Sequence, residues 1–522
     1  MFSAGQKEMK EMDDYTINRL GLPGVVLMEN AGVRVVEEIM RTTAKMISSK
    51  SHTNIVVLVG GGNNGGDGFV IGRRLVDAGF PSHVWLLADK DRLKGDAKTH
   101  YDVYMNRGLP VYSLHDHSLD DLQQQLTQAD IIVDAILGTG VRGAVREPIA
   151  EIISMVNQFS GEKPIIAVDI PSGVNSDTGK VENIAIQASK TVTFVCPKNG
   201  FFLQDGPRYV GEWKVCDISV PTTIGNQLNT KLPEIITEQK VNASLPKRPP
   251  HGHKGTFGHA LVIGGSRHFV GAPMYTAKAA FHTGAGLVTI AIPDSIYPMI
   301  AAQNPELLLL PLPDEAGHLI PEAVDTLIPQ LPKTGTIAIG PGMSQFSSGQ
   351  MWLEALFSKL DTQTLVIDAD AISFTRHRLQ DIQDYKGDII LTPHPGEMAR
   401  LMDTTVAEVE ANRLDVAKTF AQKYGIYVLL KGHRPIIATP SGTLYINPHG
   451  HDALGKGGSG DILTGLITAF LAQGVSPLDA MISASYLHAR SAEEKAKKLS
   501  HFGVTPMDVI DGVKVLLNRI TS

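Results

Sequence analysis

The segment 455–463 has the residue pattern best suited to phosphoryl chemistry. Its sequence, GKGGSGDIL, places glycines directly before an apolar helix that we expect over residues 461–472. Backbone N–H groups at a helix start can stabilise developing negative charge, and Asp461 could accept a proton from a hydroxyl that attacks a phosphoryl group. The alternative is a glycine-rich loop that Asp461 caps. The segment is no Walker loop, because G-x-x-x-x-G-K-[ST] does not match it.

Polar residues also stand at the ends of other expected strands in this half of the chain. Asp368 and Asp370 end the strand LVIDADA, and the segment TPHPGEM contains His394 and Glu397. Two prolines hold His394 in a rigid loop, which makes a binding role as plausible as a structural one. Glu397 could orient magnesium-bound water at phosphates. Its alternative role is that of a first-turn glutamate favoured by the helix dipole.

The glycine-rich segment 60–68, GGGNNGGDG, follows an apolar strand, and we expect it to turn into a helix over residues 69–78. Free N–H groups in such a turn could bind a phosphate, as in dinucleotide-binding folds. The composition argues against this, because Asp67 would repel a pyrophosphate. Asparagine and carboxylate oxygens suit a hard cation better.

Two other strand ends in this half carry polar residues that could join such a site. Asp134 precedes GTGVRG, and Asp169 precedes IPSG with Ser172. Ligands collect beyond the carboxyl ends of parallel strands, so Asn64, Asp134 and Ser172 could meet at one ion. A single strand-end aspartate can instead be a helix cap.

Short apolar runs alternate with helical stretches throughout the chain, which indicates parallel sheets covered by helices on both faces. A polar stretch that ends in two prolines suggests a boundary, so we expect domains at 1–225 and 246–522 with a linker at 226–245. We also expect an opening helix, in which Asp13 and Asp14 face solvent, and a second helix over residues 25–40.

The composition excludes several classes of protein. A net charge of −7 gives no basic surface for nucleic acid, and no apolar run reaches the roughly 18 residues of a membrane span. The first residues lack the apolar core of a signal peptide. Two cysteines form no disulfide framework, so we expect a cytoplasmic enzyme.

The segments EMKEMDDYTINRLGLPGVVLMENAG, GGGNNGGDGF, DAILGTGVRG and VDIPSGVNSDTG together resemble the NAD(P)H-hydrate epimerase family. The resemblance covers about residues 1–220 and implies a Rossmann-like three-layer sandwich. It also implies interconversion of the R and S hydrates of NADH and NADPH (NADHX and NADPHX) at C6 of the ring. Asn64, Asp134 and Ser172 would bind potassium, and Asp169 would be the acid/base. The implied substrate contacts are Asn63, Asn64, Gly65, Gly66, Asp67, Gly138, Thr139, Gly140, Val141, Arg142, Gly143, Ala144 and Asp169.

The second half resembles the NAD(P)H-hydrate dehydratase family of ribokinase-like α/β fold, through HKGTFGHALVIGGS, GAGLV, GPG, DADA, TPHPGEM, LLKG and GKGGSGD. The resemblance implies that Asp461 is the base for phosphorylation of the C6 hydroxyl by ADP or ATP with magnesium. Elimination then releases phosphate and restores NADH or NADPH. The implied hydrate contacts are Ala272, Gly342, His394 and Asp461. The implied nucleotide contacts are Lys431, Gly432, His433, Arg434, Pro435 and Gly460. The resemblance also implies a homo-oligomer.

Three alternatives stay open at this point. The chain could be a vitamin or sugar kinase with a non-catalytic N-terminal binding module, or its first half could be an interaction module. A plain NAD-dependent dehydrogenase would use the first glycine loop but would leave the second half unexplained.

Overall fold

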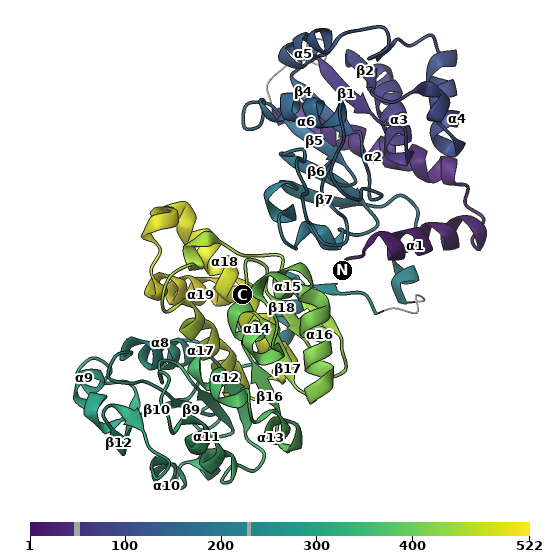
Figure 1. Ribbon diagram of the computed structural model, residues 1–522. Helices are drawn as coiled ribbons and strands as arrows, with labels where there is room; N and C mark the ends of the chain where they lie inside the picture. The colour runs from purple at the N-terminus through teal and green to yellow at the C-terminus, as the bar shows by residue number, and fades with distance from the viewer. Residues whose placement is uncertain (46–52, 227–230, 522) are drawn as a thin grey trace. The chain divides into compact units, whose positions relative to one another are not determined.

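The computed structural model describes residues 1–45, 53–226 and 231–521, and the chain divides into two compact units, Met1–Leu232 and Pro233–Ser522 (Figure 1). Residues 227–230 of the expected linker lie outside the described residues. The later part of that linker instead belongs to the second unit. Strand β8 (Glu234–Ile235) pairs with β19 (Leu444–Ile446), and α7 (Glu238–Ser244) places Val241 in the second core.

The first unit is built on a parallel sheet of seven strands in the order β3-β2-β1-β4-β5-β6-β7. The strands are β1 Ile55–Val59, β2 Ser82–Leu86, β3 Val111–Ser113, β4 Ile131–Ala135, β5 Ile165–Val168, β6 Lys190–Phe194 and β7 Glu212–Cys216. The strand order reverses direction between β1 and β4. Loops after these strands therefore open the crevice in which doubly wound sheets bind ligands.

Helices cover both faces of this sheet (Figure 1). Alternate residues of β1 point into two separate cores: Val57 packs with α1 to α4, and Leu58 packs with α5 and α6. This is the three-layer arrangement expected from the continuous apolar strands. The helices are α1 Gln6–Asn18, α2 Gly24–Lys45, α3 Asn63–Asp77, α4 Gly95–Asn106, α5 Leu119–Gln128 and α6 Ile149–Asn157.

Helix α3 begins at Asn63, six residues before the expected start at residue 69. The glycines of this segment lie inside α3, where their lack of a side chain lets the helix pack closely against its neighbours. A Cβ on Gly66 would lie 2.4 Å from Sδ of Met28, and one on Gly68 would lie 2.7 Å from a methyl carbon of Val59. The glycine-rich segment thus packs α3 tightly against α2 and the sheet, and it brings Asn64 and Asp67 into the first turns of the helix.

The second unit contains a ten-stranded mixed sheet in the order β11-β10-β9-β14-β15-β16-β17-β18-β19-β8, and its contacts from β11 to β17 are all parallel. Its other strands are β9 His259–Ile263, β10 Leu287–Pro293, β11 Leu308–Leu312, β14 Thr336–Ile339, β15 Thr364–Ile367, β16 Ile389–Leu391, β17 Tyr427–Leu430 and β18 Ile436–Ala438, with a separate hairpin of β12 Asp314–Glu315 and β13 His318–Leu319. The motif segments that follow β9, β14, β15, β16 and β17 therefore share one edge of the sheet.

The longer helices of this unit follow the parallel strands or close the fold at its C-terminal end. They are α8 Gly271–His282, α11 Gly349–Phe357, α14 Pro395–Met402, α16 Arg413–Tyr424, α17 Ser459–Ala472, α18 Pro477–Gly503 and α19 Pro506–Thr521, with short helices α9 Tyr297–Ala301, α10 Ala323–Leu327, α12 Asp370–Thr375, α13 Leu379–Asp384 and α15 Val406–Ala411. Helices α8, α17, α18 and α19 build one core with β9 and β10.

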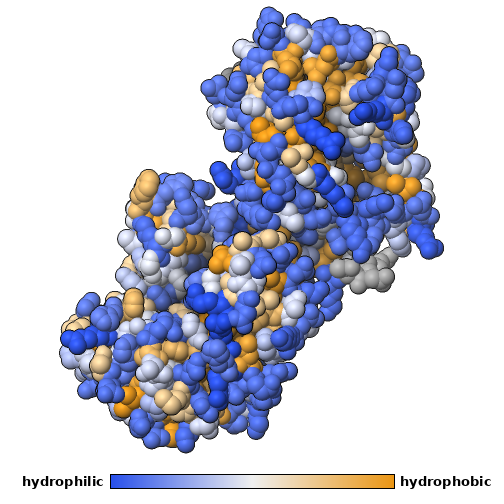
Figure 2. Space-filling view, in the orientation of Figure 1, coloured by the Kyte–Doolittle hydropathy of each residue, from blue (hydrophilic) through white to orange (hydrophobic). Residues whose placement is uncertain are grey.

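Hydrophilic residues cover most of the face shown in Figure 2, and apolar residues interrupt it in small groups. Across residues 1–45, 53–226 and 231–521, no helix has the length and apolar character needed to cross a membrane.

Candidate active sites

The residues expected to hold a cation meet beyond β1 and β4. Asp134 is fully buried, and its two oxygens accept hydrogen bonds from Ser172, from Oγ at 2.5 Å and from N at 2.8 Å. Asn64 Nδ2 donates to the Leu137 carbonyl at 3.0 Å, and Ser172 Oγ accepts the Leu137 N–H at 2.8 Å. Asn64 Oδ1 is buried and has no hydrogen-bond partner among the residues described. An unpaired buried oxygen in this group fits the oxygen chemistry of a hard cation.

The loop 138–144 lies between Asn64 and the N-terminal helix. A Cβ on Gly138 would be 3.3 Å from Cβ of Asn64. The Thr139 carbonyl accepts a hydrogen bond from Ser176 Oγ at 3.1 Å, and Arg142 Nη2 donates to Gln6 Oε1 of α1 at 3.3 Å. The structure therefore brings the two expected substrate segments, 63–67 and 138–144, to one edge of the sheet.

Asp169 directly follows β5 and forms an ion pair with Lys198, a lysine with no exposed surface. Its Oδ1 accepts hydrogen bonds from Lys198 Nζ at 2.5 Å, Thr193 Oγ1 at 3.1 Å and the Phe194 N–H at 3.2 Å. No donor among the described residues bonds to Oδ2. One oxygen is thus held firmly, and the other is left for a substrate.

Two more carboxyl groups interact with this ion pair. Burial raises the pKa of Asp13 to about 6, and the charge of Asp169 adds to this effect. Burial, again reinforced by Asp169, raises the pKa of Asp67 well above its usual range. Asp14 is exposed as expected, but Asp13 is half-buried, so the prediction that both face solvent was wrong for Asp13. Its position four residues after the buried Met9 was the available sequence signal.

In the second unit, Asp461 stands in the first turn of α17, after Gly458, whose φ of +93° lets the chain turn into the helix. The first N–H groups of a helix have no intrahelical partner and are available to an anion. Burial raises the pKa of Asp461 to about 6, and the charge of Asp368 adds to this. No described residue donates a hydrogen bond to the Asp461 carboxylate, so it is free to act on a ligand.

Lys431, at the end of β17, connects this helix start with the end of β15. Its ammonium bonds to Asp368, which is buried and also accepts a hydrogen bond from Thr464 Oγ1 of α17 at 2.6 Å. A Cβ on Gly460 would lie 3.4 Å from Lys431 Nζ. Asp368 is fully engaged by these contacts, and hence it positions Lys431 and α17.

His394 caps helix α14 and also faces outward. Its Nδ1 accepts the N–H groups of Gly396 and Glu397 at 3.0 and 3.3 Å, so the neutral ring carries its proton on Nε2. Burial, with the charge of Lys431, lowers its pKa. The half-exposed ring therefore caps the helix through Nδ1, and its Nε2 lies 3.4 Å from Glu397 Oε1. Burial raises the pKa of Glu397 to about 7, and Glu397 Oε2 accepts the His394 N–H at 2.8 Å.

Asp370, at the start of α12, binds the loop after β14. Its oxygens accept the Ser344 N–H at 2.7 Å and the Gln345 side-chain amide at 3.0 Å. This loop includes Gly342, where a Cβ would lie 3.0 Å from Cβ of Ala272, so two expected substrate residues are adjacent. A cavity of about 480 Å³ adjoins this region, and its lining includes Asp370, Glu397, Arg376 and Arg400.

The expected nucleotide segment, residues 431–435, is held by Arg413, which sequence reasoning missed. The buried Nη2 of Arg413 donates to the carbonyls of Leu430, Lys431 and Arg434 at 3.2, 3.0 and 3.4 Å. Gly432 has a φ of +153°, and a Cβ there would lie 2.6 Å from the guanidinium. A lone arginine in a helix gives no sequence signal for this role.

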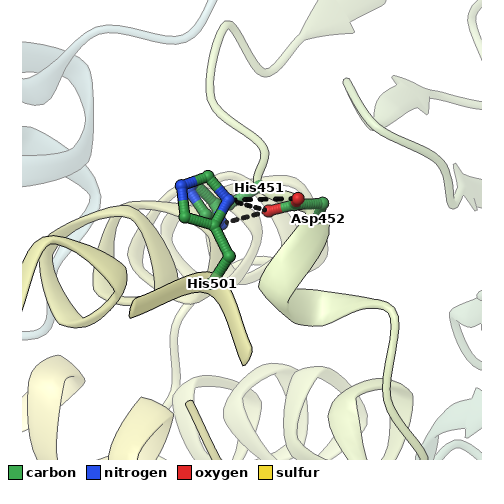
Figure 3. Close-up of side chains that lie close together, drawn as sticks. All are labelled: His451, Asp452 and His501. Atoms are coloured by element: carbon green, nitrogen blue, oxygen red, sulfur yellow. Dashed lines mark hydrogen bonds and ion pairs between the residues drawn. The ribbon is translucent and has the colours of Figure 1, made fainter. Parts of the chain in front are cut away.

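The segment 499–504 anchors the glycine loop, since Lys456 Nζ donates to the carbonyls of Phe502 and Val504 at 2.5 and 2.7 Å. Figure 3 shows the adjoining contact, in which His501 Nδ1 lies 3.0 Å from Asp452 Oδ1. His451 joins the group, but its Nδ1 already accepts the Ala453 N–H at 3.1 Å. The cluster is therefore a capped turn with hydrogen-bonded pairs, although its residue types suit a metal.

Together, the two units define a class of α/β protein in which a unit with a seven-stranded parallel sheet precedes a unit with a ten-stranded mixed sheet, each with carboxylates at the carboxyl ends of its strands. A family model described as NAD(P)H-hydrate dehydratase matches residues 260–514, and one described as YjeF-related protein N-terminus matches residues 24–200.

Relatives align over nearly the whole chain. A bifunctional NAD(P)H-hydrate repair enzyme of Moorella thermoacetica is 36% identical over 100% of this chain and 97% of its own length. The corresponding protein of Escherichia coli is 33% identical over 89% of this chain and 85% of its own. An ADP/ATP-dependent NAD(P)H-hydrate dehydratase from Bacillus subtilis, co-crystallized with ATP/Mg²⁺, is 31% identical over 55% of this chain and 98% of its own, with a TM-score of 0.48.

The chain belongs to the family of bifunctional NAD(P)H-hydrate repair enzymes. It is an enzyme with NAD(P)H-hydrate epimerase and dehydratase activities, which confirms the resemblance found in the sequence. This membership favours the repair function over the kinase, interaction-module and dehydrogenase alternatives.

Proposed function

We propose that Asp169 is the acid/base of the epimerase and that Asp461 is the base of the dehydratase. One structural feature, which both sites share, supports this assignment. Each carboxylate lies at the carboxyl edge of a parallel sheet and keeps an oxygen without a hydrogen-bond donor among the described residues. A free oxygen in a partly buried carboxylate can exchange a proton with a substrate hydroxyl.

In the dehydratase, Asp461 takes the proton of the C6 hydroxyl as that oxygen attacks the terminal phosphoryl group of ADP or ATP. AMP or ADP leaves, and the C6–O bond then breaks with loss of a C5 proton, which gives phosphate and NADH or NADPH. The N–H groups at the start of α17 face the developing charge. Magnesium bound to the nucleotide supplies positive charge at its phosphates, and Glu397 would hold it through water.

The remaining binding roles follow the placement of each segment. The S hydrate contacts Ala272, Gly342 and the Nε2–H of His394, which all lie at the edge that holds Asp461. The nucleotide contacts Gly460 and the segment Lys431, Gly432, His433, Arg434 and Pro435, whose backbone Arg413 fixes. In the epimerase, residues 63–67 and 138–144 contact either hydrate.

We assign potassium to Asn64, Asp134 and Ser172, on the evidence of the unpaired buried oxygen of Asn64. When bound, the ion supplies a positive charge that balances the buried Asp134 carboxylate. A cytoplasmic location is supported by two buried free cysteines, which suit a reducing compartment. The homo-oligomer rests on the family resemblance alone.

The test is recovery of NADH absorbance from mixed R and S NADHX, with magnesium, potassium and either nucleotide. Full nucleotide-dependent recovery, faster than spontaneous epimerisation in a control, supports both assignments. Recovery that stops at the S fraction would remove the epimerase assignment. No recovery with either nucleotide would remove the dehydratase assignment.

We predict that Arg413→Met raises the KM for ADP and ATP at least several-fold and lowers the melting temperature of the second unit. Three carbonyls lose their donor, and a buried group left unsatisfied, as Leu430 would be, costs about 1–3 kcal/mol. Thermal melting and nucleotide titration of the dehydratase measure both effects. Lys418→Met, on the same helix, is the control and should change neither. Equal behaviour of the two variants would refute the role of Arg413.

We also predict that Asn64→Ala abolishes the stabilisation of the first unit by potassium. An ion bound to the folded state alone stabilises it by about 2.7 kcal/mol at a hundred times its Kd. Thermal melts in potassium chloride and in choline chloride at the same concentration measure this difference. Asn63→Ala removes an exposed amide one position earlier and should keep the potassium effect. A potassium effect that survives in Asn64→Ala would place the ion elsewhere.

A further inference from the structure

Helix α1 brings the carboxyl group of Asp13 to the epimerase site, where none of the roles proposed above uses it. The helix packs on the segment that carries Lys198. Ala4 pairs with Lys198 as an isolated β-bridge, and Met9 Sδ lies 3.6 Å from Cys196 Sγ. Asp13 follows Met9 by four residues and so lies one turn further on the same face of α1. This packing places Asp13 beside the ion pair of Asp169 and Lys198.

Asp13 is half-buried, yet it forms no hydrogen bond or ion pair with any described residue. The charged and titratable groups that act on it are Asp169, Lys198 and its neighbour Asp14, and it acts in turn on Asp67. Buried polar groups are normally satisfied, so a carboxyl group without a partner beside a catalytic ion pair points to a ligand.

The chemistry of epimerisation calls for a second proton-transfer group. The hydrate is a hemiaminal, in which C6 carries both the hydroxyl and the ring nitrogen N1. Inversion requires that one bond to C6 breaks and forms again on the other face. Opening the C6–N1 bond needs a base at the hydroxyl and an acid at N1, because the bonding electron pair departs with nitrogen.

We propose that Asp13 is the general acid that protonates N1 while Asp169 takes the hydroxyl proton. This inference rests on the proposed role of Asp169. The O–H proton passes to Asp169 Oδ2, C6 becomes an aldehyde carbonyl, and the C6–N1 electron pair takes a proton from Asp13. After rotation about C5–C6, N1 attacks the other face of the carbonyl. The N–H proton returns to Asp13, and Asp169 returns its proton to oxygen.

The two environments favour this division of roles over its reverse. Three donors, one of them an ammonium, hold Asp169 Oδ1 and leave Oδ2 as an acceptor for a proton, as a base requires. Asp13 lacks such donors, and burial raises its pKa to about 6, which favours the protonated form that an acid requires. Environments that separate two carboxyl groups in this way typically mark an acid and base pair.

The test measures conversion of R-NADHX to S-NADHX by chromatography, without nucleotide, for the full chain and its variants. We expect Asp13→Asn to lower kcat/KM by about 10²-fold or more, the usual contribution of a general acid. In the wild-type chain, kcat/KM should fall as the pH rises through about 6, because Asp13 must be protonated. The Asp13→Asn variant should lack this alkaline limb, and Asp13→Glu should restore part of the rate. The exposed neighbour gives the matched control Asp14→Asn, which should keep the wild-type rate.

Nucleotide-dependent dehydration of S-NADHX and an unchanged thermal melt would show that Asp13→Asn is folded. A wild-type rate in Asp13→Asn would overturn the inference, and so would a slow rate with the alkaline limb intact, since that outcome indicates a structural role. Loss of activity in Asp169→Asn alone would leave the proposed function standing without the role of Asp13. A wild-type chain that does not epimerise would overturn both.

Discussion

Asp461→Asn should abolish nucleotide-dependent recovery of NADH and leave the epimerase rate unchanged. The amide keeps the shape of the carboxyl group but cannot take the hydroxyl proton, and loss of a catalytic base typically lowers a rate by about 10²–10⁴-fold. The measurement is NADH absorbance from purified S-NADHX with ADP or ATP, next to R-to-S conversion without nucleotide.

The same substitution should not destabilise the second unit at neutral pH. The folded-state pKa of Asp461 is raised to about 6, so its contribution to stability is full below its unfolded value of about 4 and declines as the pH rises through 6. Above that pH the carboxylate is a buried charge, which asparagine removes. A variant that is inactive yet melts no lower than wild type at pH 7.5 would separate a catalytic role from a structural one.

Asp508→Asn is the matched control for this experiment. Asp508 also stands in a helix first turn, but it only caps α19 by accepting hydrogen bonds from Thr505. We expect a small loss of stability and full dehydratase activity. If Asp508→Asn lost dehydratase activity as Asp461→Asn is expected to do, loss of a carboxylate in a helix first turn would be enough to explain the effect of Asp461→Asn. If both activities disappeared in Asp461→Asn, the two sites would not be independent.

The buried parallel strands were the part of the fold most open to prediction from sequence. Runs such as those of β1 and β4 are apolar at every position because both faces of the sheet are covered by helices. Short strands such as β3 and β8 escaped prediction, since two or three residues carry no periodicity. The start of α3 was placed too late because its glycines, poor helix formers, serve close packing.

The candidate sites were predictable where residues stand in motifs at strand ends and helix starts. The structure brings Asn64, Asp134 and Ser172 into one hydrogen-bonded group, as the shared sheet edge predicts. Lys198, Asp13 and Arg413 were missed for a common physical reason. Each reaches its site through long-range packing. A lysine after a proline and a single arginine in a helix do not differ locally from solvated residues, whereas Asp13 had one weak signal, its position one helical turn after the apolar Met9.

Asp169→Asn should abolish epimerisation and leave dehydration of S-NADHX intact. Asp169 has a φ of +63°, a region that asparagine tolerates, so the backbone should not change. The rate should fall by about 10²–10⁴-fold through loss of the proton acceptor. R-to-S conversion measures the first effect, and NADH recovery from S-NADHX measures the second.

This variant also removes the counter-charge of the fully buried Lys198, so its first unit should melt at a lower temperature. Removing one partner of a buried ion pair costs about 3–5 kcal/mol of folding free energy. The cost for this variant should not exceed that range, because Asp169 is partly exposed. The double variant Asp169→Asn/Lys198→Met removes the uncompensated ammonium and should regain stability without regaining activity. Recovery of both in the double variant would show that Asp169 serves only to neutralise Lys198, whereas recovery of stability alone assigns the chemistry to the carboxylate.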